Sequence, residues 1–223
     1  MATTATVFPF IGAARRIRLK QRWSAELLDI LGIGLETDGP PIPPGCLLVA
    51  NHISWLDIFV INAVWPAAFI SKAEVRGWPV IGWLATRNET VFLRRGSRGH
   101  ARIVNEEIAG LLGRGRHVAL FPEGTTTDGS HVRPFHAALL QPAIEAGAPI
   151  QPLAIAYRLP DGRYTRAAAY DGDVSLGESI RAIIGERRIV ARIEVAPLLV
   201  TRDGPDRKAL AHAAHGAIVG RLA

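Results

Sequence analysis

The sequence predicts an α/β protein with a mostly parallel central sheet flanked by helices and preceded by an N-terminal amphipathic helix. Short apolar runs typical of buried strands alternate with longer segments whose apolar residues recur at helical spacing. The chain has 223 residues, and a chain of this size buries enough surface to fold without disulfides or a structural metal. We therefore expect a single large domain with one short additional segment.

The composition is that of a globular protein and indicates an acidic partner. Apolar residues make up 48% and charged residues 21%, close to globular averages, which excludes a disordered chain. A single cysteine, Cys46, excludes a disulfide framework and a cysteine-rich metal site. Lys and Arg outnumber Asp and Glu by 26 to 20. This excess favours a phosphate-bearing small molecule, an anionic membrane, an acidic protein or nucleic acid as partner.

The chain is predicted to consist of an N-terminal segment, 1–37, and one domain, 38–223. Residues 14–31 have a helical pattern, and basic residues crowd the first half of this helix. The helix either packs on the domain with its charges in solvent or lies in the interface of an anionic membrane. No apolar stretch reaches the roughly 20 residues of a membrane span, and we expect neither a span nor a signal peptide. The apolar face of this helix comprises Leu19, Trp23, Leu27, Ile30 and Leu31.

After a Pro- and Gly-rich turn at 38–45, strands and helices alternate to the end of the chain. In parallel sheets, binding and catalytic residues lie beyond the carboxyl ends of strands. Two of the predicted strands are followed by polar loops, which makes those loops the first candidates for a site. The predicted strands are 46–50, 68–71, 90–93, 117–121, 150–157 and 187–195. The predicted helices are 57–64, 79–86, 99–112, 136–146 and 206–222.

The loop after strand 46–50 contains a candidate acid–base pair. His52 follows the strand, and a helix that begins near Ser54 would let Asp57 reach one ring nitrogen of His52. A carboxylate on that nitrogen fixes the tautomer and stabilises the imidazolium, so that the other nitrogen can accept a proton. The alternative is structural, because Ser54 and Asp57 also have the spacing of a capping box at a helix N-terminus.

Two further loops have the composition of an anion-binding site. Residues 121–129 follow a strand with the sequence FPEGTTTDG, and backbone N–H groups there could hold a phosphate or an oxyanion. Arg94, Arg95 and Arg98 follow strand 90–93, and guanidinium groups bind phosphate bidentately. The alternatives are an ordinary turn for the first loop and a solvated basic turn for the second. The sequence lacks the nucleotide-binding, serine-hydrolase and zinc-protease motifs.

Taken in order, these blocks resemble those of the lysophosphatidate acyltransferases, a family of glycerolipid acyltransferases, over roughly residues 15–200. Two departures concern the acceptor. Thr126 and Thr127 stand where the family has Arg and Ser, and Glu89 stands where the second block opens with Gly. The missing Arg belongs to the signature of a phosphate-bearing acceptor, and the resemblance also extends to bacterial relatives that acylate lyso-ornithine lipid. The matching residues are Asn51, His52, Ser54 and Asp57 for N-H-x-S-x-x-D, Phe92 to Arg95 for the second block, 121–125 for F-P-E-G-T-R-S, and 149–155 for the fourth block, an apolar strand around a proline.

The resemblance implies transfer of an acyl group from acyl-CoA or acyl-carrier protein to a lysophospholipid hydroxyl, first of all on 1-acylglycerol-3-phosphate, giving phosphatidic acid in phospholipid biosynthesis. It implies His52 as general base and Asp57 as the residue that orients it. We expect no metal or other cofactor, no nucleic acid, and a peripheral position on the cytoplasmic side of the membrane. Residues expected around the substrates are Asn51, Ser54, Arg94, Arg95, Glu123, Gly124 and Thr125, with Trp55, Phe59 and Trp83 in an acyl groove or in the core.

Three alternatives stay open on the sequence alone. The acceptor can be lyso-ornithine lipid, which has no phosphate. Water can replace the lipid hydroxyl, which would make the protein a thioesterase. A non-catalytic module that binds membranes or acyl-carrier protein is the alternative from another class, and the intact His52 and Asp57 argue against it. Backbone N–H groups near Asn51 or Gly124 are candidates for the oxyanion donors.

Overall fold

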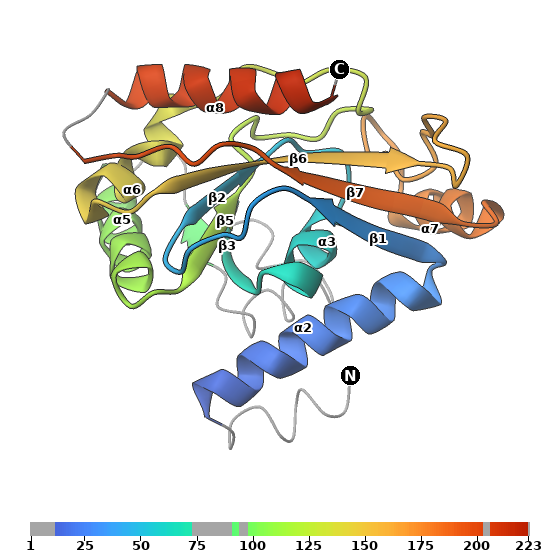
Figure 1. Cartoon of the computed structure of the whole chain (residues 1–223), viewed down its shortest axis with the longest axis horizontal. Helices are drawn as coiled ribbons and strands as arrows, with labels where there is room; N and C mark the ends of the chain where they lie inside the picture. The colour runs from blue at the N-terminus through green and yellow to red at the C-terminus, as the bar shows by residue number, and fades with distance from the viewer. Residues whose placement is uncertain (1–11, 73–90, 94–97, 203–205, 223) are drawn as a thin grey trace.

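A seven-stranded sheet forms the centre of the molecule in the computed structural model, which describes residues 12–72, 91–93, 98–202 and 206–222 (Figure 1). The strand order is β1-β7-β6-β2-β5-β3-β4. The only antiparallel pair in this sheet of described strands is β6–β7, and the other five pairs are parallel. The predicted α/β class with a mostly parallel sheet is therefore confirmed. The strands are β1 (Ile33–Asp38), β2 (Leu47–Ala50), β3 (Ala67–Lys72), β4 (Val91–Leu93), β5 (His117–Leu120), β6 (Ile150–Arg158) and β7 (Ile189–Val195).

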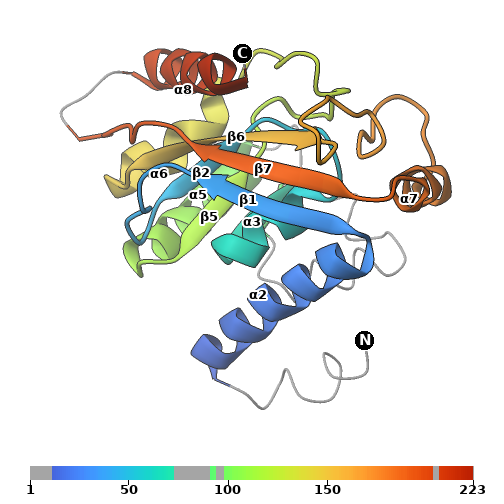
Figure 2. The same cartoon turned by 45° about the vertical axis from the view of Figure 1, so that its right-hand side comes forward.

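Helices cover both faces of the sheet, and each face has its own apolar cluster (Figures 1 and 2). Successive side chains of a strand point to opposite faces. In β2, Leu48 and Ala50 therefore pack on the face of α2, α3 and α7, whereas Leu47 and Val49 pack on the face of α5, α6 and α8. Burial on both sides explains why this strand is entirely apolar. The helices are α2 (Ala13–Ile30), α3 (Asp57–Val64), α5 (Arg98–Gly113), the 3₁₀ helix η3 (Ala137–Leu140), α6 (Gln141–Ala146), α7 (Leu176–Gly185) and α8 (Arg207–Leu222).

Helix α2 confirms the helix predicted at 14–31. Four of the five residues of its predicted apolar face are half-buried, and the fully buried positions each lie one residue beyond Leu19, Trp23 and Leu27. Lys20, Ser24 and Leu28 are the buried positions, and Nζ of Lys20 donates to the carbonyl of Ala67 at 2.8 Å. Ile30, at the end of the predicted apolar face, is 80% exposed. Lys20 therefore belongs to the packing of α2 on the domain rather than to a solvated basic stripe. No helix within the described residues is long and apolar enough to cross a membrane.

Two elements were missed by the sequence analysis, and one predicted helix is divided into two shorter ones. β1 ends where the predicted turn begins and pairs with β7 at the edge of the sheet, and only its first residue, Ile33, is buried. α7 begins at a capping box formed by Ser175 and Glu178, a signal that the sequence contained. The helix predicted at 136–146 is a 3₁₀ turn followed by α6. The division at residue 37, which β1 crosses, stays a prediction, and the helix predicted at 79–86 lies outside the described residues.

Candidate active site

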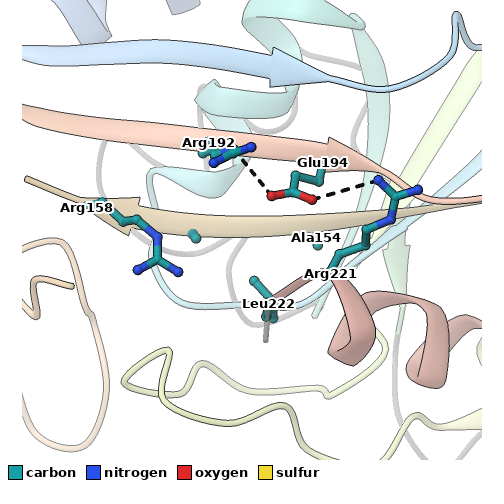
Figure 3. Close-up of a pocket in the computed structure, with 7 residues that line it drawn as sticks. Ala154, Arg158, Arg192, Glu194, Arg221 and Leu222 are labelled. Atoms are coloured by element: carbon teal, nitrogen blue, oxygen red, sulfur yellow. Dashed lines mark ion pairs between the residues drawn. The ribbon is translucent and has the colours of Figure 1, made fainter. Parts of the chain in front are cut away.

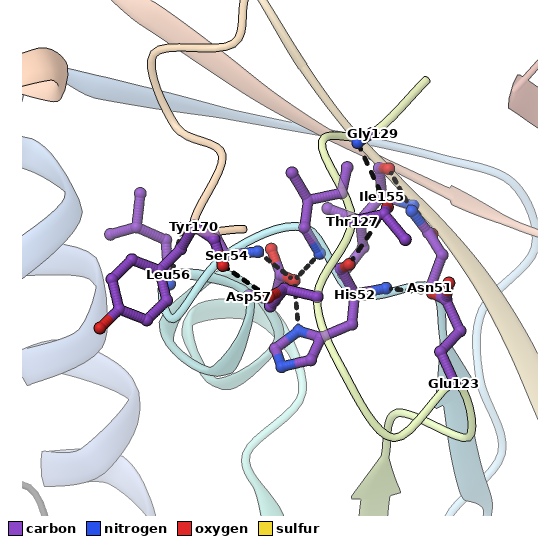
Figure 4. Close-up of polar contacts among 12 residues, drawn as sticks. Asn51, His52, Ser54, Leu56, Asp57, Glu123, Thr127, Gly129, Ile155 and Tyr170 are labelled. Atoms are coloured by element: carbon purple, nitrogen blue, oxygen red, sulfur yellow. Dashed lines mark hydrogen bonds and ion pairs between the residues drawn. The ribbon is translucent and has the colours of Figure 1, made fainter. Parts of the chain in front are cut away.

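His52 and Asp57 form an ion-pair geometry at the carboxyl end of β2 (Figure 4). β2 ends at Ala50, and the chain crosses from the sheet to α3, whose first residue is Asp57. Nδ1 of His52 lies 2.8 Å from Oδ2 of Asp57. Asp57 is fully buried, whereas the side chain of His52 is 19% exposed. The sequence prediction that these two residues meet is confirmed by this geometry.

The carboxylate of Asp57 also organises the loop that carries His52. Oδ2 accepts hydrogen bonds from the backbone N–H groups of Ile53 at 2.7 Å and of Ser54 at 3.0 Å. In a capping box, Oγ of Ser54 would also accept from the N–H of Asp57. That bond is not formed, because the N–H of Asp57 donates to the carbonyl of Ser54 and Oγ of Ser54 accepts from the N–H of Leu56. Asp57 thus contacts the ring and holds the loop with the same oxygen, without forming the capping box that was the alternative.

The ring of His52 is held from a second side by Phe121, which follows β5. The two rings stack with their centroids 3.9 Å apart and their planes within 6° of each other. Nε2 points away from Asp57 (Figure 4) and has no hydrogen-bond partner among the described residues. When Nδ1 carries the proton that faces Asp57, Nε2 has a free lone pair. A partly exposed imidazole with this orientation can take a proton from a substrate hydroxyl.

Glu123 is buried behind the loop of His52, and its carboxyl accepts hydrogen bonds from two backbone N–H groups. Oε1 accepts from the N–H of His52 and Oε2 from the N–H of Arg133, each at 2.7 Å. Burial of the carboxyl, which is 4% exposed, raises its pKa above the ordinary value. Glu123 therefore ties the loop after β5 to the loop after β2. Its expected place beside the acceptor with Arg95 stays a prediction, because Arg94 and Arg95 lie outside the described residues.

Asn51 and Gly124 take structural roles within this site. The side chain of Asn51 donates to the carbonyl of Ile155 at 2.9 Å and accepts from its N–H at 2.8 Å, which continues the β2–β6 pairing. Gly124 has a φ of 73° and its N–H donates to the carbonyl of Phe121. That N–H is engaged in a turn, so Gly124 itself does not supply a free donor for an oxyanion. Thr125 is exposed at the same turn.

Thr126, which stands in place of the family's Arg, is used within the protein. Its hydroxyl donates to the carbonyl of Tyr170 at 2.5 Å, and the N–H of Tyr170 donates to the carbonyl of Ile53 at 2.9 Å. On the other side, the N–H of Thr127 donates to the carbonyl of His52 at 2.8 Å. The loop 123–129 and the loop that contains Tyr170 thereby hold the chain at His52 and Ile53 in place, and Figure 4 shows Thr127 and Tyr170 on either side of the loop of His52.

Tyr157 is the site residue that the sequence analysis missed. It lies on β6, is 2% exposed, and its hydroxyl donates to Oδ1 of Asp57 at 2.7 Å. Burial and the neighbouring carboxylate of Asp57 raise the pKa of this phenol well above its ordinary value. The available signal was a tyrosine within an apolar strand, because a buried phenol hydroxyl needs a hydrogen-bond partner.

The half-buried aromatic residues near the site pack against one another between three helices. The rings of Trp55 and Phe59 are 5.8 Å apart, and those of Trp23 and Phe59 are 5.6 Å apart, both in edge-on arrangements. Nε1 of Trp55 donates to Oγ of Ser179 on α7 at 3.1 Å. Trp55 and Phe59 therefore contribute to packing, and Trp83, the third residue predicted for an acyl groove, lies outside the described residues.

A pocket between β6, β7 and the end of α8 lies away from this site (Figure 3). Its β6 positions, Ala154 and Arg158, alternate with Tyr157 along the strand and so face the other side of the sheet. Glu194 in this pocket is paired with Arg192 at 3.3 Å and with Arg221 at 3.8 Å. The single carboxylate thus lies between two of the three arginines that line the pocket, and no predicted site residue lines it. No group of three or more potential metal ligands occurs within the described residues.

Residues 37–156, which include the whole loop from Asn51 to Asp57, match the family model described as Acyltransferase. The chain belongs to the acyltransferase family. This acyltransferase is 43% identical over 204 residues to a lyso-ornithine lipid O-acyltransferase of Pseudomonas aeruginosa, covering 91% of this chain and 78% of the relative. It is 38% identical over 186 residues to a 1-acyl-sn-glycerol-3-phosphate acyltransferase of Neisseria meningitidis, covering 82% and 72%.

The fold of this acyltransferase is also found in a solved structure. The crystal structure of the 1-acyl-sn-glycerophosphate acyltransferase PlsC from Thermotoga maritima superposes with a TM-score of 0.72 at 21% identity, covering 99% of this chain and 86% of that one. At this identity the likeness concerns the fold alone. The family predicted from the four sequence blocks is confirmed by the family model and by the two bacterial relatives.

Proposed function

We propose that this acyltransferase moves a fatty acyl group from an acyl thioester, acyl-CoA or acyl-carrier protein, to the free hydroxyl of a lysolipid in membrane lipid biosynthesis. The observation that carries the proposal is the contact between Nδ1 of His52 and Oδ2 of Asp57, 2.8 Å long. It leaves Nε2 of a partly exposed ring available as a base. A lipid hydroxyl is a poor nucleophile at neutral pH, and a positioned base removes that obstacle.

In this mechanism Nε2 of His52 takes the proton of the acceptor hydroxyl as its oxygen attacks the thioester carbonyl. Asp57 stabilises the imidazolium that forms. The carbon–sulfur bond then breaks, the thiolate leaves, and the imidazolium returns the proton to the sulfur. The acyl group passes directly between the two substrates, so the protein needs no nucleophile of its own. Catalysis without a metal or other cofactor is part of this proposal, and activity abolished by a chelator and restored by a divalent ion would contradict it.

Two acceptors are candidates. Lysophosphatidate is supported by the relative from Neisseria meningitidis and by the arginines at 94, 95 and 98, whose guanidinium groups suit a phosphate. Lyso-ornithine lipid is supported by the relative from Pseudomonas aeruginosa and by Thr126. The hydroxyl of Thr126 is engaged with the carbonyl of Tyr170, and it cannot replace a guanidinium toward a dianion.

The proposed location is the cytoplasmic side of the cell membrane, with the protein bound peripherally to an anionic surface. Helix α2 supports this location, because Arg15, Arg18 and Arg22 are exposed on it while Lys20 and Leu28 are buried against the domain. An exposed basic face attracts anionic headgroups. Helix α2 would then bind lipid with one side and the domain with the other.

An assay of the purified full chain tests the proposed function. The protein is supplied with acyl-CoA or acyl-carrier protein and with lysophosphatidate or lyso-ornithine lipid, and mass spectrometry identifies the products. Transfer predicts a diacylated lipid that requires His52. Release of free fatty acid with no acylated lipid would show a thioesterase instead, and binding of both substrates without turnover would show a non-catalytic module.

A further inference from the structure

The buried carboxylate of Asp57 has a donor on each of its two oxygens, and the donors differ in kind. Oδ2 accepts from the ring of His52 and from the N–H groups of Ile53 and Ser54, all of which belong to the same loop. Oδ1 accepts from the hydroxyl of Tyr157, which lies 100 residues further along the chain on β6. A carboxylate held through both oxygens cannot rotate about its own axis.

The contact with Tyr157 is formed in the dry interior, where it has the greatest effect. Asp57 is 0% and Tyr157 is 2% exposed, and the ring of Tyr157 belongs to the apolar cluster under α3 and α7. Hydrogen bonds to charged groups are stronger than those between neutral groups, and more so away from water. The phenol stays protonated, because burial and the charge of Asp57 raise its pKa, so it acts as a constant donor.

We propose that Tyr157 is a positioning residue for the reaction, which orients the carboxylate of Asp57 and thereby sets the basicity of His52. The inference rests on the proposed role of His52 as the base. A donor on Oδ1 draws negative charge away from Oδ2, which weakens the stabilisation of the imidazolium. Tyr157 therefore keeps the imidazole ready to release its proton to the leaving thiolate while it fixes the direction of the hydrogen bond to Nδ1.

Tyr157→Phe tests the role of the hydroxyl while it keeps the ring in the core. We expect kcat to fall roughly tenfold, the scale of a lost hydrogen bond to a charged group. We expect little change in KM for either substrate, because Tyr157 does not contact them. Without the donor on Oδ1, the acid limb of the kcat/KM profile should move to higher pH, because Asp57 then stabilises the imidazolium more strongly.

The control is Tyr164→Phe, the same chemical change at an exposed tyrosine whose hydroxyl donates to the backbone carbonyl of Asp128. It should leave kcat and the pH profile unchanged. If His52→Ala inactivates the protein but Tyr157→Phe keeps the kcat and the acid limb of the parent, the inference is overturned and the proposed function stands. Activity that survives His52→Ala would instead overturn the proposed role of His52.

A second measurement keeps the inference testable if Tyr157→Phe does not fold. The chain has three tyrosines, so 3-fluorotyrosine incorporated into a Tyr164→Phe, Tyr170→Phe protein labels Tyr157 alone. The fluorinated phenol is a stronger donor of nearly the same size. The acid limb should then move to lower pH than in the unlabelled double variant, opposite to the shift for Tyr157→Phe. An unmoved limb would contradict the inference.

Discussion

The backbone N–H of His52 donates to Oε1 of Glu123 at 2.7 Å, so the residue that carries the base is held by a carboxylate 71 positions away. The other oxygen of Glu123 accepts from Arg133 at the same distance. His52 is thus fixed through its backbone by Glu123 and through its ring by Asp57 and Phe121. The two carboxylates orient the imidazole without pairing to the same atom.

His52→Ala should reduce kcat by at least about a hundredfold, the usual scale for a lost general base. The melting temperature should change little, because the ring is partly exposed and the backbone bonds of residue 52 remain. Steady-state kinetics and thermal unfolding of the purified variant measure both. His212→Ala, at an exposed position of α8, is the control and should behave as the parent enzyme. Near-parental turnover of His52→Ala would remove His52 as the base.

Asp57→Asn should give a folded protein with kcat at least about a hundredfold lower, because the amide lacks the charge that stabilises the imidazolium. Asp206→Asn is the matched control, since Asp206 also accepts two backbone N–H groups, at the start of α8, but lies on an exposed helix end. If Asp57→Asn is fully active while Asp57→Ala merely lowers the melting temperature, Asp57 serves the loop alone and not the base.

Glu123→Gln should lower the free energy of unfolding by about 1–3 kcal/mol, because glutamine has one acceptor oxygen for two buried N–H donors. The loss should depend on pH. The raised pKa of Glu123 means that the folded state holds its proton more tightly than the unfolded state. The contribution of Glu123 to stability is therefore complete at a pH below its pKa in the unfolded chain. It declines as the pH rises through its pKa in the folded protein.

The stability difference between the parent and Glu123→Gln should accordingly be largest in acid and shrink as the pH rises above the ordinary pKa of glutamate. Chemical denaturation of both proteins across that range measures it. A difference that instead grows with pH would show that the ionised Glu123 is stabilised by His52 and Arg133 more than burial penalises it.

The sequence predicted the elements with strong periodic patterns and the pairing of His52 with Asp57, because that pairing depends on neighbours five residues apart. It did not predict Tyr157 beside Asp57 or Glu123 beside the N–H of His52 as internal contacts. Those contacts join strands and loops that only the sheet order brings together. β1 escaped prediction because its outer half is exposed and lacks the apolar pattern of a buried strand.

Arg15→Gln combined with Arg18→Gln should weaken binding to anionic vesicles without loss of fold, because both side chains are exposed on α2. Binding of the parent should fall as salt rises, since exposed charges are screened. Vesicle sedimentation measures both effects. Arg207→Gln with Lys208→Gln removes the same charge from the exposed start of α8 and should bind as the parent does. Equal losses in the two double variants would show a general charge effect rather than a face on α2.

Arg95→Ala tests whether a phosphate-bearing acceptor is bound by the arginines that follow β4. If Arg95 holds the phosphate, its loss should raise KM for lysophosphatidate at least roughly tenfold, as expected for a charge-assisted contact. The same change should matter much less with lyso-ornithine lipid, which has no phosphate. Arg181→Ala, at an exposed position of α7, is the control for a lost surface charge and should alter neither KM. Acylation of lyso-ornithine lipid with no acylation of lysophosphatidate would exclude the phosphate-bearing acceptor. The preference for the phosphate-free acceptor would then be assigned to Thr126, whose hydroxyl already donates to the carbonyl of Tyr170.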